Sequence, residues 1–104
     1  MTKAVRPSSF AEDEIEYYLR RYESESPGLG DRLWDDIQTV ASLISEYPKI
    51  GELVRRTRGL VRRIPLHHFP FFVIYRERED GLQIVALAHT SRKPNYWRHR
   101  LAYD

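Results

Sequence analysis

The chain has 104 residues, a length typical of one folded unit, so we expect a single domain over residues 1–104. It contains no cysteine, which excludes disulfides and thiolate metal sites and fits a reducing compartment. No apolar run approaches the ~20 residues of a membrane span, and residues 1–14 lack the apolar stretch of a signal peptide. We therefore expect a cytoplasmic protein with no membrane association.

The net charge of +2 hides an uneven distribution along the chain. Residues 1–50 contain six basic and ten acidic side chains, a net charge of −4, whereas residues 51–104 contain eleven basic and five acidic side chains, a net charge of +6. Such asymmetry favours a charged partner. A surface on which the two signs pair with each other explains the same numbers equally well.

A first helix is predicted from Ser9 to about Ser24. Residues 3–7 before it have the weak alternation of a short strand, which Pro7 ends. Ser9 and Glu12 have the spacing of a capping box. Apolar residues then recur at helical spacing, and they form one face: Ala11, Ile15, Tyr18, Leu19 and Tyr22.

A second helix is predicted after a break at residues 24–28. Pro27 is either a turn residue or the first helical residue, with Ser26 as its cap. Pro48 ends this helix near residues 46–47. Its apolar stripe consists of Leu29, Leu33, Ile37, Val40 and Ile44. The two helices form a hairpin, which needs a further layer to bury its stripes.

After Gly51 the hydrophobic period changes to two, which is typical of strands. Asp80-Gly81 is a turn signal that joins the last two strands into a hairpin, and Pro94 opens a short terminal helix at residues 95–101. Four segments have the strand period, the first of them weakly: 52–56, 60–66, 71–78 and 82–89. We therefore predict an α+β fold, in which a helical hairpin packs on a twisted antiparallel sheet of three to four strands.

The sequence contains no phosphate-binding, dinucleotide-binding, zinc-hydrolase or serine-hydrolase motif. None of the four histidines lies at metal-ligand spacing from another, and no cluster of Asp and Glu accompanies them. We therefore expect no metal and no cofactor.

Arginines are the first candidates for binding. Five of them fall within nine positions: Arg55, Arg56, Arg58, Arg62 and Arg63. Guanidinium groups suit a phosphate backbone or an acidic peptide, but salt bridges to the acidic residues 12–16 of the first helix explain the cluster equally well. If Arg62 and Arg63 share a strand, their side chains point to opposite faces.

The C-terminal segment mixes aromatic and basic side chains. Tyr96, Trp97 and Arg100 are of the types that dominate protein-binding hot spots and that stack on bases, although packing of Trp97 on the sheet is the favoured alternative. His89 ends a strand near Arg92. It is the one plausible titrating group beside these cations, and can act as a general acid or base if the cations stabilise a charged phosphate.

The motifs, in their order and spacing, resemble those of the RelE/ParE toxin family of bacterial type II toxin–antitoxin systems, often labelled plasmid-stabilisation proteins. The resemblance covers nearly the whole chain, and its last motif is the most specific. The matching motifs are Pro27-Gly28-Leu29-Gly30, Tyr47-Pro48-x-x-Gly51, Gly59-Leu60-Val61-Arg62-Arg63, Phe69-Pro70-Phe71 with Val73-Ile74-Tyr75, and His89-x-x-Arg92-x-Pro94-x-x-Trp97-x-x-Arg100.

The resemblance implies a toxin that a cognate antitoxin holds inactive in a hetero-oligomer through an acidic C-terminal segment. The Phe-Pro-Phe strand start and the C-terminal motif favour the ParE branch, which inhibits DNA gyrase and is not known as a nuclease. The residues that would then bind the antitoxin or the target are Arg55, Arg56, Arg58, Arg63, Tyr96, Trp97 and Arg100.

The RelE branch is the alternative, and its members cleave mRNA on the ribosome. On that interpretation the chain is a metal-independent endoribonuclease with His89, Arg62 and Arg92 as catalytic residues. The sequence leaves open whether the protein is an enzyme.

Overall fold

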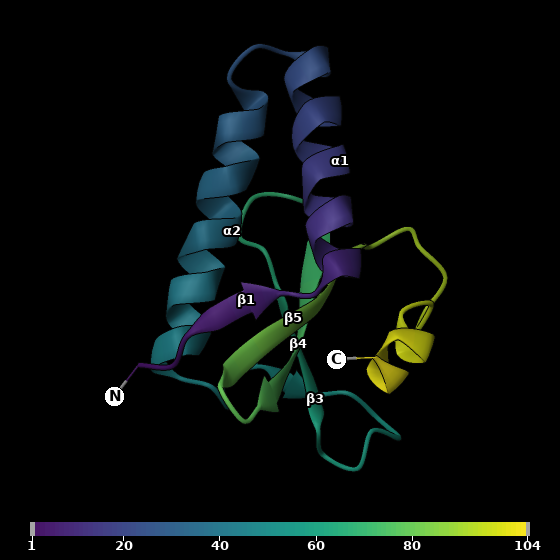
Figure 1. Cartoon of the computed structure of the whole chain (residues 1–104). Helices are drawn as coiled ribbons and strands as arrows, with labels where there is room; N and C mark the ends of the chain where they lie inside the picture. Colours follow the sequence, from purple (N-terminus) through teal and green to yellow (C-terminus); the bar gives the residue numbers. More distant parts are fainter. Residues whose placement is uncertain (1, 104) are drawn as a thin grey trace.

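Two helices and a five-stranded sheet make up the computed structural model, which describes residues 2–103 (Figure 1). The strand order across the sheet is β1-β5-β4-β3-β2. In chain order the elements are β1 (Val5–Pro7), α1 (Ser9–Glu25), α2 (Leu29–Glu46), β2 (Glu52–Leu53), β3 (Val61–Pro65), β4 (Phe71–Arg78), β5 (Gly81–His89) and the 3₁₀ helix η1 (Arg98–Ala102). The predicted α+β fold class is confirmed.

The sheet has more strands than the expected three to four, and it is mixed. β1 is a full member, and it runs parallel to β5, with Val5 opposite Leu82. β2 is shorter than the predicted segment 52–56, because the backbone of Arg56 turns away with a φ of 61°. The terminal helix is also shorter than predicted and is of the 3₁₀ type.

The first helix begins at Ser9 as predicted, but its cap is a different residue, and the structure selects the turn alternative for Pro27 before the second helix. The cap of α1 is Ser8, one residue before Ser9, and its side chain accepts a hydrogen bond from the Ala11 N–H at 3.1 Å. α2 begins after Gly28, whose φ of 89° is left-handed, so Pro27 lies outside the helix. The carboxylate of Glu23 replaces a local cap, because it accepts from the N–H groups of Gly28 and of Gly30, the latter at 3.0 Å.

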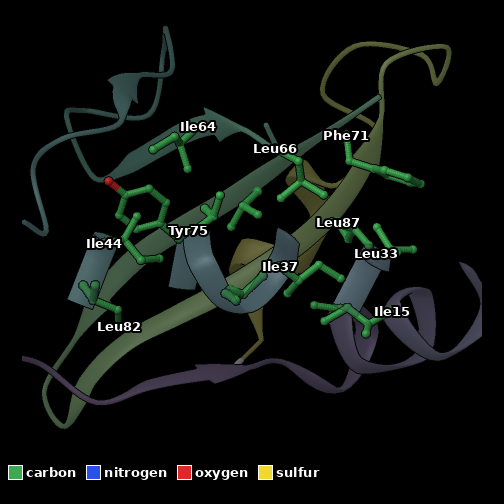
Figure 2. Packing of buried hydrophobic residues seen from close by; sticks show 14 residues of the cluster. Ile15, Leu33, Ile37, Ile44, Ile64, Leu66, Phe71, Tyr75, Leu82 and Leu87 are labelled. Atoms are coloured by element: carbon green, nitrogen blue, oxygen red, sulfur yellow. The ribbon is translucent and has the colours of Figure 1, made fainter. Parts of the chain in front are cut away.

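The main core lies between the helices and one face of the sheet (Figure 2). Both predicted helical stripes contribute to it, and so do alternate residues of the strands. The members labelled in the figure are Ile15, Leu33, Ile37, Ile44, Ile64, Leu66, Phe71, Tyr75, Leu82 and Leu87.

A second, smaller core covers the opposite face of the sheet, which we call the outer face. Trp97 is 3% exposed and packs there with residues of three strands, including Val61, Ile74 and Ala88. The C-terminal segment, residues 90–103, thus covers a part of the sheet that the helices leave open (Figure 1). This position agrees with the packing alternative for Trp97.

Asp36 of α2 is a buried carboxylate that holds the loop between β3 and β4. It is 4% exposed, and its two oxygens accept from the backbone N–H groups of His67, at 3.0 Å, and His68, at 2.7 Å. Asp36→Asn is expected to lower the free energy of unfolding by about 1–3 kcal/mol, because the amide can accept only one of the two bonds. Urea denaturation measures this loss, and the exposed Asp35→Asn, with an expected change within about 0.5 kcal/mol, is the matched control.

Within residues 2–103, no helix has the length and apolar character that crossing a membrane requires.

Candidate functional site

The two layers of the molecule are oppositely charged. The helical hairpin, residues 9–46, contains ten acidic and three basic side chains, a net charge of −7. Residues 47–103, which form most of the sheet and the C-terminal segment, contain four acidic and twelve basic side chains, a net charge of +8. The uneven charge of the sequence is therefore also uneven in space, and the sheet layer attracts anions.

A cavity of about 150 Å³ opens on the outer face, between the sheet and the C-terminal segment. Arg63, Arg92 and Lys93 line it together with the rings of Phe72 and Tyr96. The Arg63 guanidinium lies 4.7 Å from the ring centroid of Phe72, and that of Arg92 lies 3.9 Å from that of Tyr96. The aromatic faces thus orient two of the cations that border the cavity.

The loop between β2 and β3 presents three more arginines, Arg55, Arg56 and Arg58, all exposed. Buried Thr57 anchors the loop, and its hydroxyl donates to the Val54 carbonyl at 2.6 Å. The guanidinium of Arg98 donates to the carbonyls of Arg55, at 2.5 Å, and Arg56, at 3.1 Å. The C-terminal segment therefore holds the backbone of this loop in place. We call these three arginines together with Arg63, Arg92 and Lys93 the cationic surface.

Arg62 does not belong to the cationic surface. Its guanidinium donates to the carbonyls of Lys49, at 3.0 Å, and Gly51, at 2.7 Å. It lies on the face of β3 that also presents Ile64 to the main core. The prediction that Arg62 and Arg63 point to opposite faces is confirmed.

Of the three residues expected to be catalytic on the RelE interpretation, His89 and Arg92 both line the cavity, but Arg62 does not. Arg62 lies opposite Tyr75 in the register of β3 and β4, whereas His89 lies opposite Phe71. Four residues of β4 therefore separate their positions, about 13 Å along the strand. Arg92 lies on the outer face over Tyr96, on the other side of the sheet from Arg62.

The surroundings of His89 assign its tautomer. The backbone N–H of Ser91 donates to His89 Nδ1 at 3.0 Å, which places the proton of the neutral ring on Nε2. The ring also stacks on Tyr18 and meets Phe71 edge-on, with centroids 6.1 Å and 5.1 Å away. A general base needs a free lone pair facing its substrate, and in this arrangement that of Nδ1 is already occupied.

Glu14 of α1 forms a buried ion pair with Arg100 of η1. Their side chains are 13% and 9% exposed, and Arg100 Nη1 and Nη2 donate to Glu14 Oε1 and Oε2 at 2.7 Å and 2.9 Å. The Tyr96 hydroxyl donates to Oε2 at 2.6 Å, and the Leu87 N–H donates to Oε1 at 3.1 Å. Burial and then the Glu14 hydrogen bond raise the pKa of Tyr96.

This ion pair meets β5 at an irregularity of the sheet. Tyr75 of β4 lies opposite Ile84 and Ile74 lies opposite Ala86, so Val85 is an extra residue between them. The Val85 carbonyl accepts from Arg100 Nη1 at 3.1 Å. The bonds to Val85 and Leu87 thus join α1, β5 and the C-terminal segment at one point.

The residues predicted to bind a partner therefore divide into two groups. Arg55, Arg56, Arg58 and Arg63 are exposed, whereas Tyr96, Trp97 and Arg100 hold the C-terminal segment against α1 and the sheet.

Sequence reasoning missed the role of Glu14. A signal was present, because Glu14 is three residues from Ala11 and four from Tyr18 and so falls on the apolar stripe of α1. A carboxylate on a buried face needs a cation or other hydrogen-bond donors.

Among residues 2–103, no group of three or more His, Asp or Glu side chains converges as metal ligands. The arginines and Lys93 of the cationic surface supply the groups that bind anions.

The chain matches a family model over residues 5–94, and that model describes the ParE toxin of type II toxin–antitoxin systems. The chain belongs to the ParE toxin family. The match confirms the predicted RelE/ParE family and its ParE branch. The exposed arginines of the cationic surface lie within the matched residues, whereas Tyr96, Trp97 and Arg100 lie beyond them.

The structure is also similar to a solved structure of the chromosomal ParDE toxin–antitoxin system from P. aeruginosa. The TM-score is 0.73 at 15% sequence identity, and the similarity covers 86% of this chain and 98% of the other. At this identity the likeness shows that the ParE-like fold is shared. No curated protein matches the sequence.

Proposed function

We propose that this chain is the toxin of a toxin–antitoxin pair and that it acts by binding and inhibiting DNA gyrase. Membership of the ParE toxin family over residues 5–94 is the observation that carries the proposal. Two observations favour binding over RNA cleavage: Arg62 is separated from His89, and the Nδ1 lone pair of His89 already accepts from the Ser91 N–H, although Arg92 lines the same cavity as His89.

The proposed partner in the resting state is an antitoxin with an acidic C-terminal segment. The net charge of +8 on residues 47–103 complements such a segment. The similar P. aeruginosa structure is of a toxin–antitoxin system, which supports the same kind of complex here. Toxin and antitoxin would form a hetero-oligomer in the cytoplasm, where gyrase acts.

A supercoiling assay tests the proposal. Purified toxin at micromolar concentration is expected to block supercoiling of relaxed plasmid by gyrase and to increase cleaved DNA. The antitoxin encoded beside the gene is expected to restore supercoiling when it is added first. His89→Ala is expected to inhibit gyrase as strongly as the unmutated toxin, because His89 has no catalytic task in this proposal.

The contrary result is equally specific. Unaffected gyrase at micromolar excess of toxin would contradict the proposal. Codon-linked breaks in translated mRNA after induction, abolished by His89→Ala, would instead support the ribosome-dependent endonuclease. Relaxation of plasmid by a type I topoisomerase in the presence of toxin is the control for non-specific effects on DNA.

A further inference from the structure

Two arginines in the loop between β2 and β3 have a backbone conformation that side chains rarely adopt. The φ angles are 61° at Arg56 and 57° at Arg58, and Gly59 follows with a φ of 71°. Glycine adopts positive φ without strain, and asparagine tolerates it better than arginine does. Arginine at both positions is thus unfavourable for the backbone, which indicates that the side chains have a function.

The side chains of these arginines are free although their backbone is fixed. Within residues 2–103, the guanidinium groups of Arg55, Arg56 and Arg58 make no hydrogen bond, ion pair or ring contact. Thr57 and Arg98 hold the backbone through the bonds described above. Because the backbone is already fixed, anion binding has to order the arginine side chains but not the loop itself.

The other residues of the cationic surface, Arg63, Arg92 and Lys93, extend the positive charge of the loop. The one ion pair of this surface among the described residues joins Arg63 to Glu52 at 2.8 Å. The guanidinium of Arg92 has no acidic partner in the same part of the chain, and Tyr96 orients it. An extended anion can therefore contact several unneutralised cations at once.

The surface has no large exposed apolar side chain of the kind that anchors protein interfaces, because Phe72 and Tyr96 are half-buried and Arg63 and Arg92 lie over their rings. Val61 and Ile74 of the outer face are buried beneath the C-terminal segment, whose Trp97 packs against them and is itself buried. The exposed Leu60 lies two residues before Arg62 and Leu53 lies opposite it, so both belong to the other face of the sheet. Cations without exposed apolar anchors are the pattern of a surface that binds nucleic-acid phosphates.

We propose that Arg55, Arg56 and Arg58, together with the neighbouring cations of the outer face, bind the phosphodiester backbone of duplex DNA. The inference rests on the proposed function, since gyrase holds duplex DNA while it cleaves and reseals it. A toxin that contacts both enzyme and DNA would stabilise the complex between them.

Fluorescence anisotropy with a labelled DNA duplex, without gyrase, tests the inference. We expect the unmutated toxin to bind, with an affinity that falls steeply between 50 and 200 mM NaCl. In R56G/R58G the slope of log K against log salt should become shallower by about 2, because each lost phosphate contact removes about 0.9. The melting temperature of this variant should equal or exceed that of the unmutated toxin, because glycine relieves the strain at both positions.

The matched control is R20Q/R21Q, which removes two exposed arginines from α1 on the helical side. It should keep the slope of the unmutated toxin. R56N/R58N should lose the same two contacts as the glycine variant, and it provides the test if the latter fails to fold.

Three results would overturn the inference: no binding of the duplex, equal loss in the control and the loop variant, or equally tight and equally loop-dependent binding of poly-glutamate. The assay contains no gyrase, so its failure is distinct from failure of the proposed function. A toxin that inhibits gyrase but does not bind DNA overturns this inference alone. One that binds DNA but leaves gyrase active overturns the proposed function.

Discussion

Replacing Glu14 with glutamine is expected to lower the free energy of unfolding by about 3–5 kcal/mol. The glutamine keeps the shape of the side chain but leaves the guanidinium of Arg100, whose side chain is 9% exposed, as an unneutralised buried charge. None of the four donors that reach Glu14 belongs to α1 or its neighbours in sequence, and the nearest along the chain is the Leu87 N–H. Urea denaturation followed by tryptophan fluorescence measures the loss.

The control for Glu14 is Glu16→Gln. Glu16 forms an ion pair with Arg20 on the exposed side of α1, and such a pair contributes about 0.3–0.5 kcal/mol. Adding Arg100→Met to Glu14→Leu should recover part of the stability lost in Glu14→Gln, because no charge then remains buried. Equal losses of unfolding free energy in Glu14→Gln and Glu16→Gln would show that the buried pair stabilises the protein no more than the exposed pair does.

Trp97→Ala is expected to destabilise the protein by about 3–5 kcal/mol. The indole fills the outer-face core against Val61, Ile74 and Ala88, and its removal leaves a cavity. Hydrogen exchange should become faster throughout residues 90–103, because the segment loses its main apolar contact with the sheet. Urea denaturation measures the stability change in the same samples.

Trp34 provides the matched control, since it is the other of the two tryptophans and is 44% exposed. Trp34→Ala should cost less than about 1 kcal/mol and leave exchange in the C-terminal segment unchanged. A Trp97→Ala protein as stable as Trp34→Ala would contradict the packing role. The Glu14 and Trp97 variants should also combine with less than the sum of their separate losses, because both release the same segment.

Local periodicity predicted the elements of the fold well where the pattern was long. Leu33 of α2 and Phe71 of β4 lie in the main core as their spacing indicates. β1 has only three residues, so its pattern could not show that its partner is β5, more than 70 positions away. The start of α2 could not be found from local caps either, because the acceptor that satisfies it is Glu23 of the preceding helix.

The candidate site was likewise predictable only where a local pattern determines the arrangement. Alternation along a strand was enough to separate Arg62 from Arg63. The distance from Arg62 to His89 depends on the register of three strands, which no local pattern contains. The positive φ of Arg56 could not be predicted either, because arginine rarely adopts this backbone conformation.

The separation of charge between the two layers also governs how the molecule meets another in solution. A polyanion attracts the sheet layer, whose net charge is +8, and repels the helical layer, whose net charge is −7. The electric field of the partner therefore orients the protein before the two molecules make contact. The Debye length is about 10 Å at 0.1 M salt, so the electrostatic orientation acts only when the two surfaces are within about that distance of each other. Association with an anionic partner should therefore be fast and orientation-selective in buffer of low ionic strength. Added salt should change the association rate constant much more than the dissociation rate constant.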